Sequence, residues 1–301
     1  MAAEALPLPR ARRAARLFVQ LADYWALTKP EVNFLILITT LAGFQVGIGG
    51  RLMMILHTLL GTLLVAGGAS ALNQFLERSF DAQMRRTARR PLASGRLEPS
   101  HVRAFGTALS LAGAVYLALV VNVLTSLLAV IALLGYLYLY TPAKRKTPLC
   151  TLVGALAGAI PPLIGWAAAR GRLGPGAWVL YALLFLWQFP HFMAIAWMYR
   201  EDYSRAGYLI LPVGGNRDRI VILQSFFVSM VLIPISLIPT ITGSAGFIYC
   251  LGALALGSIF LMSSARFAFQ RSTATARQLL VASIIYLPAV LALMMLDRTQ
   301  A

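Results

Sequence analysis

The chain has 301 residues, of which 59% are hydrophobic and only 12% are charged, and its mean hydropathy is +0.76. Soluble domains of this length carry more charge, so the composition excludes an ordinary soluble protein and indicates a polytopic helical membrane protein. The formal net charge of +16 is compatible with nucleic-acid binding, but the positions of the charges favour anionic lipid headgroups and anionic substrates, with no nucleic acid. The two cysteines, Cys150 and Cys250, have no metal-binding spacing and indicate no disulfide framework.

Residues 1–28 precede the first long apolar run and include four arginines, at positions 10, 12, 13 and 16. A secretory signal would have an adjacent apolar core of about 7–15 residues and a cleavage site, and neither is found here. An arginine-rich, acid-poor start also resembles a mitochondrial transit peptide. We favour the alternative that this segment is a cytoplasmic amphipathic lead-in.

Nine apolar runs long enough to span a bilayer follow along the chain. They lie near residues 33–50, 53–72, 103–122, 124–141, 150–168, 177–197, 219–239, 245–264 and 278–296. The stretch from 106 to 140 is nearly unbroken, but its length of about 35 residues would cross a bilayer twice. We therefore place a short connection at 121–124. The pattern predicts an all-α polytopic membrane protein with one transmembrane domain over residues 1–301.

The distribution of arginine and lysine tests this count, because cytoplasmic connections of membrane proteins are enriched in these residues. With nine spans and a cytoplasmic N-terminus, all but four of the 26 basic residues fall in cytoplasmic segments. The exceptions are Arg51, Arg170, Arg172 and Arg298. This separation requires an odd number of spans, so it supports nine transmembrane helices.

A group of polar residues follows the second apolar run. Asn73, Glu77 and Asp81 are spaced four residues apart, so on a helix they lie on one face over two turns. Arg86 and Arg90 follow, before the helix-breaking Pro91. Oxygen ligands and guanidinium groups in this order suit a hydrated Mg²⁺ that carries a diphosphate. The alternative is a solvated basic helix end with an incidental stripe of carboxylates.

A second group of acidic residues and arginines lies at 200–219, on the same predicted side of the membrane. Ionisable groups near membrane depth are functional candidates, because inserting one costs about 2.5–3.5 kcal/mol. The prolines at 161, 162 and 190 predict kinks that open a cavity between helices. The segment 154–169 is rich in glycine and alanine, which predicts either a close helix contact or room for an apolar ligand.

Five motifs, in the expected order, resemble the UbiA superfamily of intramembrane prenyltransferases and, within it, the branch that farnesylates haem. The first is the group from Asn73 to Asp81 with Met84, Arg86, Thr87, Arg90 and Pro91. The others are Asp23-Tyr24 with Leu27-Thr28-Lys29-Pro30, Tyr140-Thr141 with Lys144-Arg145 and Thr147-Pro148, Gly154 to Trp166, and Trp187 to Phe192 with Asp202-Tyr203 and Ala206-Gly207. A match to one such motif is weak evidence for the resemblance, whereas matches to five motifs in the expected order are specific evidence.

The resemblance implies nine transmembrane helices around one central cavity that opens toward the cytoplasm, in a bacterial inner membrane. A mitochondrial inner membrane is the less favoured location. The implied reaction transfers a farnesyl group from farnesyl diphosphate to a vinyl group of haem B, with addition of water. The implied partners are these two substrates and the lipid bilayer, with haem A synthase as a candidate downstream partner.

The resemblance also assigns roles to individual residues. It implies Mg²⁺ bound through Asn73, Glu77, Asp81 and Asp202, and a haem-binding or proton-transferring role for His191. It implies that diphosphate or propionate groups contact Arg86, Arg90, Lys144, Arg145, Tyr140 and Tyr203. Two departures from the wider superfamily are Glu77 in the first acidic motif and a second motif reduced to Glu201 and Asp202. They leave the number of Mg²⁺ ions open.

Other interpretations remain at this stage. A related enzyme would prenylate an aromatic acid or a quinone precursor. A transporter would also carry clustered charges and kinked helices, but the sequence has no internal repeat of the kind that many transporters show. A haem-binding membrane subunit without activity is the third alternative. His191 is compatible with a core-packing role, and Lys144 and Arg145 with a role in topology alone.

Overall fold

The computed structural model describes residues 10–47, 52–211 and 216–299. Across these residues the chain is helical, and its β structure is limited to one isolated bridge between Ala245 and Arg298. The helices in chain order are α1 (Arg10–Leu27), α2 (Pro30–Val46), α3 (Leu52–Asp81), α4 (Pro99–Tyr116), α5 (Val123–Leu134), α6 (Thr141–Ala143), α7 (Cys150–Gly158), α8 (Pro161–Arg170), α9 (Pro175–Met198), α10 (Arg200–Arg205), α11 (Asn216–Ile241), α12 (Phe247–Gln270) and α13 (Thr273–Leu296), with π-helical turns η1 (Leu117–Val121) and η2 (Gly135–Tyr140).

Within the described residues, eight helical segments are long and apolar enough to cross a membrane, and α2 is a shorter apolar helix of 17 residues. Together they match the nine predicted runs one for one. Three predicted runs are composite: α4 continues into η1, α5 continues through η2 into α6, and α7 is followed by α8. The sequence therefore predicts the order of the helical segments correctly. In the described residues eight of the nine predicted spans are long enough to cross a membrane, α2 is shorter, and the ends of the segments differ from the predicted ones by several residues.

The break in the long apolar stretch occurs at Asn122, inside the predicted connection at 121–124. The Asn122 side chain accepts a hydrogen bond from the backbone N–H of Thr125 at 2.8 Å, which caps the start of α5. Its amide nitrogen donates to the carbonyl of Ala167 at 3.0 Å. A single asparagine thus ends one span, starts the next and ties the turn to α8.

Helices α2 and α8 pack closely because glycines lie at their contact. A Cβ atom at Gly165 would collide with the carbonyl of Thr40, and one at Gly43 would collide with the carbonyl of Pro162. The prediction of a close helix contact for the glycine- and alanine-rich segment is therefore confirmed in α8. The chain breaks between α7 and α8 just before Pro161, because proline has no N–H to continue the helical bonds.

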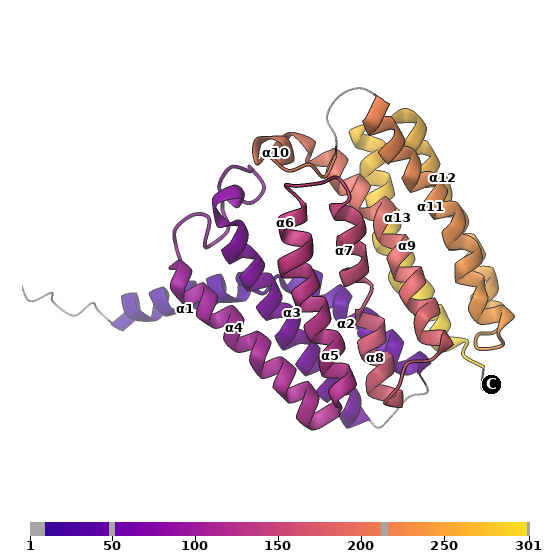
Figure 1. Cartoon of the computed structure of the whole chain (residues 1–301), viewed down its shortest axis with the longest axis horizontal. Helices are drawn as coiled ribbons and strands as arrows, with labels where there is room; N and C mark the ends of the chain where they lie inside the picture. Colours follow the sequence, from indigo (N-terminus) through magenta and orange to yellow (C-terminus); the bar gives the residue numbers. More distant parts are fainter. Residues whose placement is uncertain (1–9, 48–51, 212–215, 300–301) are drawn as a thin grey trace, which may run out of the picture.

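The helices form one bundle, from which α1 projects to one side (Figure 1). The loop after α3, the end of α6 and helix α10 lie at the same end of the bundle (Figure 1). Helix α3 continues to Asp81, about two turns beyond the predicted end of its apolar run. It carries the predicted polar face of Asn73, Glu77 and Asp81 to that end, where all three side chains are buried.

Candidate active site

A cavity of about 440 Å³ lies inside the bundle. One part of it is lined mainly by aliphatic side chains, among them Val65, Ala69, Leu133, Ile164 and Leu184. Its polar end is lined by charged and amide side chains: Lys29, Asn73, Glu77, Asp81, Arg90 and Lys144. The predicted central cavity is therefore present, and α3 brings three of the predicted metal ligands to its wall.

Glu77 is at the centre of the polar end and is 5% exposed. Its carboxylate accepts two contacts from the Lys144 ammonium, at 2.8 and 3.1 Å. It also accepts hydrogen bonds from the Tyr208 hydroxyl at 3.0 Å and from the Asn73 amide at 3.0 Å. Because the charge and the lone pairs of this carboxylate are satisfied, its burial is tolerated.

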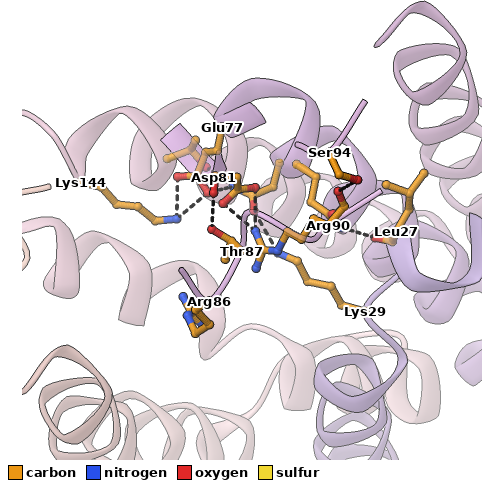
Figure 2. A network of polar contacts seen from close by, with 12 residues as sticks. Leu27, Lys29, Glu77, Asp81, Arg86, Thr87, Arg90, Ser94 and Lys144 are labelled. Atoms are coloured by element: carbon orange, nitrogen blue, oxygen red, sulfur yellow. Dashed lines mark hydrogen bonds and ion pairs between the residues drawn. The ribbon is translucent and has the colours of Figure 1, made fainter. Parts of the chain in front are cut away.

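Asp81 is paired with Arg90, which comes from the loop after α3. One guanidinium nitrogen, Nη1, lies 2.9 and 2.8 Å from the two carboxylate oxygens. The Thr87 hydroxyl donates to the backbone carbonyl of Asp81 at 2.8 Å, which holds the loop against the helix end. Figure 2 shows Lys144 and Arg90 reaching the neighbouring carboxylates from different sides, with Arg86 lying apart from the cluster.

Lys29 is a site residue that the sequence analysis did not single out. Its ammonium donates to the Asn73 side-chain oxygen at 3.0 Å and lines the cavity. It adopts a left-handed backbone conformation (φ 50°), which is uncommon for lysine, immediately before Pro30 starts α2. Burial, together with the nearby charges of Arg90 and Lys144, lowers the pKa of Lys29 to about 7. Only its place in the Leu27 to Pro30 motif hinted at this role.

Arg86 also lines the cavity, and it contacts aromatic residues. Its guanidinium lies 4.8 Å from the Tyr199 ring centroid and 5.8 Å from that of Tyr203, and it donates to the Tyr203 hydroxyl at 3.3 Å. Tyr140 lines the cavity, with the Lys144 ammonium 4.6 Å from its ring centroid. The predicted contact residues Arg86, Arg90, Lys144, Tyr140 and Tyr203 are therefore brought together.

Two predicted site residues lie elsewhere. The Arg145 guanidinium is over the Phe80 ring, 4.1 Å from its centroid, and Arg145 is not among the residues that line the cavity. Asp202 lines a separate cleft of about 200 Å³. There it accepts the backbone N–H groups of Arg85 and Arg86 and pairs with Arg205. Burial acts to raise the pKa of Asp202, but these N–H groups and Arg205 outweigh it and hold the pKa below its usual value.

The donors that face the cavity suit a hard cation. In the part of the chain that the structure describes, no group of three or more His, Cys, Asp or Glu side chains is placed to hold a metal ion together. The available set is two carboxylates, Glu77 and Asp81, and the amide oxygen of Asn73, which are the oxygen ligands that Mg²⁺ prefers. Each of the three contacts a cationic side chain.

His191 lines the apolar part of the same cavity. Its ring stacks on Trp187 with 4.7 Å between centroids, and its Nδ1 lies 2.8 Å from the Ser283 hydroxyl oxygen. That hydroxyl donates to the Leu280 carbonyl at 2.6 Å, so it accepts from Nδ1–H of the histidine. Nε2 then carries the free lone pair, and the ring is held by α13 and by Trp187.

Four cationic side chains line the polar end, Lys29, Arg86, Arg90 and Lys144, against the two carboxylates of Glu77 and Asp81. The cavity lies inside a bundle of apolar helices, and its cationic end continues into an apolar part. This chemistry suits a membrane protein that acts on a molecule with an anionic head group and a long apolar tail. The chain belongs to the UbiA prenyltransferase family, whose sequence profile matches residues 36–287.

Individual relatives agree with this assignment. The chain is 48% identical over 287 residues to the protoheme IX farnesyltransferase of Solibacter usitatus, covering 92% of this chain and 98% of the relative. In fold it is similar to a solved structure described as digeranylgeranylglyceryl phosphate synthase in membranes, with a TM-score of 0.75 at 19% identity, covering 92% of this chain and 98% of that one. It is also similar to a UbiA homologue from Archaeoglobus fulgidus bound to DMAPP and Mg²⁺, with a TM-score of 0.64 at 15% identity, covering 90% and 99% of the two chains.

Proposed function

We propose that this protein transfers the farnesyl group of farnesyl diphosphate to a vinyl group of haem B, while water adds a hydroxyl to the porphyrin side chain. The relative that is 48% identical over nearly the whole chain is named for this activity. The observation that carries the proposal is the single cavity that joins a cationic polar end to an apolar part containing His191. The polar end suits the diphosphate, and the apolar part suits the farnesyl chain and the reacting edge of the haem.

The diphosphate is bound by cations that the carboxylates already hold in place. Glu77 fixes the Lys144 ammonium, and Asp81 fixes one nitrogen of Arg90. Negative charge grows on the diphosphate as the bond to the farnesyl carbon breaks. Cationic donors that already line the cavity stabilise this charge as it forms. The aliphatic wall of the cavity keeps water from the farnesyl carbon until the haem vinyl group attacks it.

Mg²⁺ fits the same polar end. Asn73, Glu77 and Asp81 would hold it, since they present two carboxylates and an amide oxygen to the cavity. When bound, the ion neutralises part of the diphosphate charge. The choice of Mg²⁺ as the ion is supported by the UbiA homologue from Archaeoglobus fulgidus, which is described as bound to DMAPP and Mg²⁺.

His191 is assigned to the second substrate. Its Nε2 lone pair is free because Nδ1–H is committed to Ser283. Imidazole in this state can bind haem iron or accept a proton when water adds. Its position on the apolar part of the cavity, rather than in the cationic cluster, supports a role toward haem and not toward the diphosphate.

The membrane location belongs to the same proposal. The charge pattern supports a cytoplasmic N-terminus with residues 1–28 on that side, and the bacterial source of the relatives supports a bacterial inner membrane. A cavity whose polar end lies among basic loops then opens toward the cytoplasm. Haem A synthase is proposed as the partner that takes the product.

Mass spectrometry of haem extracts tests the proposal, using cells that express the protein together with a supply of farnesyl diphosphate. The expected product is haem B heavier by one farnesyl and one hydroxyl group. Asp81→Asn serves as the control, because it keeps the size of the side chain but loses the charge that pairs with Arg90. If an added aromatic acid or quinone precursor is prenylated and the haem mass does not change, the proposal is wrong about haem B, and that compound is the acceptor.

A further inference from the structure

The corner between α9 and α10 contacts the loop after α3 through three side chains, Tyr199, Asp202 and Tyr203. The contacts join residues more than a hundred positions apart in the sequence, since the Arg86–Asp202 and Arg86–Tyr203 pairs are separated by 116 and 117 residues. Asp202 touches the backbone of the loop, and the two tyrosines touch the Arg86 side chain. The corner therefore contacts Arg86 both at its backbone N–H and at its guanidinium group.

Both oxygens of the Asp202 carboxylate take part in this contact. Its Oδ1 accepts the backbone N–H of Arg85 at 3.3 Å and pairs with the Arg205 guanidinium. Its Oδ2 accepts the backbone N–H of Arg86 at 3.1 Å. The Asp202 residue is 7% exposed, so neither loop amide has water as a ready replacement partner.

Asp202 and the cavity-facing carboxylates have different partners. Glu77 and Asp81 bind side chains that line the main cavity, and these flexible cations can move when a metal or an anion arrives. Asp202 binds backbone amides, which cannot leave without moving the loop. It also lines the separate cleft with Arg85 and Arg205 rather than the main cavity.

Turning Asp202 from its separate cleft toward a metal ion in the main cavity would break two charge-assisted hydrogen bonds and release the loop that carries Arg86. We propose instead that Asp202 is a positioning residue: it fixes the backbone at Arg85 and Arg86 so that Arg86 is held in the main cavity between Tyr199 and Tyr203. The part of this inference that concerns catalysis rests on the proposed function and on the predicted contact of Arg86, which lines the main cavity, with a diphosphate or propionate group. The part that concerns the loop does not.

Amide hydrogen exchange tests the loop directly in the full-length protein in nanodiscs. Asp202→Asn retains one acceptor oxygen and loses the charge, so we expect the amides of Arg85 and Arg86 to exchange at least about tenfold faster. Glu201→Gln is the matched control, because it changes the neighbouring carboxylate of the same cleft without touching either amide. Unchanged exchange in Asp202→Asn would overturn the proposal.

A measurement on the wild-type chain needs no variant. Addition of Mg²⁺ is expected to leave the protection of the Arg85 and Arg86 amides unchanged or higher. A metal ligand would have to release these amides, so faster exchange on addition of Mg²⁺ would show that the proposal is wrong. This readout does not depend on farnesyl transfer, and it therefore distinguishes a failure of this inference from a failure of the proposed function.

Turnover supplies a third test. If Asp202 acts through Arg86, Asp202→Asn lowers turnover but leaves the Mg²⁺ concentration for half-maximal activity within about twofold of the wild type. In the background of Arg86→Gln, the same change causes little additional loss, because the residue through which it acts is already gone. A rise of several-fold in the half-saturating Mg²⁺ concentration would assign Asp202 as a ligand and contradict the proposal.

Discussion

At the scale of single residues, Arg90 illustrates why the chemical group at a position matters more than its charge. Its Nη1 contacts both oxygens of Asp81, and within the described residues no hydrogen bond involves its Nη2 or Nε. A lysine could keep one contact to Asp81. It could not offer the remaining donors of the guanidinium fork to a phosphate.

We therefore expect Arg90→Lys to fold normally and to lose affinity for a farnesyl diphosphate analogue by about tenfold or more, as for the loss of a charge-assisted hydrogen bond. Binding measurements on the purified variant check this, with Arg89→Lys as the control because Arg89 is exposed and is not among the cavity-lining residues. Equal affinity in the two variants would show that Arg90 does not bind the diphosphate through its guanidinium fork and serves only as a structural partner for Asp81.

His191 gives a prediction that separates binding of the two substrates. We expect His191→Ala to lose haem conversion and to keep the affinity for the diphosphate analogue, because the ring lies on the apolar part of the cavity away from the cationic cluster. Ser283→Ala should reduce conversion less, since it frees the ring but keeps the imidazole. Both activities are measured on the same purified protein. A histidine that only packs would show normal conversion per folded molecule and a lower melting temperature.

At the scale of elements, the sequence predicts the helices and one face of the site. Asn73, Glu77 and Asp81 are placed together by the helical period alone, and the structure confirms that they share the face that lines the cavity. Local rules could not find Lys29 or Tyr208, which reach this face from positions 44 and 131 residues away from their partners. For the same reason, the resemblance that predicted Asp202 as a metal ligand could not show its contacts with the backbone amides of Arg85 and Arg86, more than a hundred residues away.

The contact between α2 and α8 gives a prediction about packing. A Cβ at Gly165 would lie 2.7 Å from the backbone nitrogen of Phe44, besides colliding with Thr40, so one helix must move to admit it. We expect Gly165→Ala to destabilise the protein by about 1–3 kcal/mol, the usual cost of overpacking. Gly174→Ala is the control, because its nearest new neighbour would be 3.6 Å away on Trp166. Thermal unfolding in detergent measures both, and equal melting temperatures would contradict the close contact.

At the scale of the whole molecule, the distribution of basic residues predicts how the bundle, and with it the site, is oriented in the membrane. The loop after α3, which supplies Arg86 and Arg90, is among the most basic connections of the chain, and it lies at the same end as α10 (Figure 1). Arg170, the last residue of α8, and Arg172, in the connection to α9, are two of the four basic residues predicted on the other side. If the positive-inside rule holds, the polar end of the cavity faces the cytoplasm.

Cysteine labelling in intact cells decides this orientation. In a variant with Cys150 and Cys250 replaced by alanine, a membrane-impermeant maleimide should label Arg172→Cys in intact cells and Arg89→Cys only after permeabilisation. Both positions are exposed, so a difference in labelling reports the side of the membrane and not burial. Labelling of Arg89→Cys in intact cells would show that the orientation is the reverse of the predicted one and that the proposed diphosphate site lies on the outer side. The anionic substrate would then have to reach the site from the outside, so the result also tests how farnesyl diphosphate gains access to its proposed pocket.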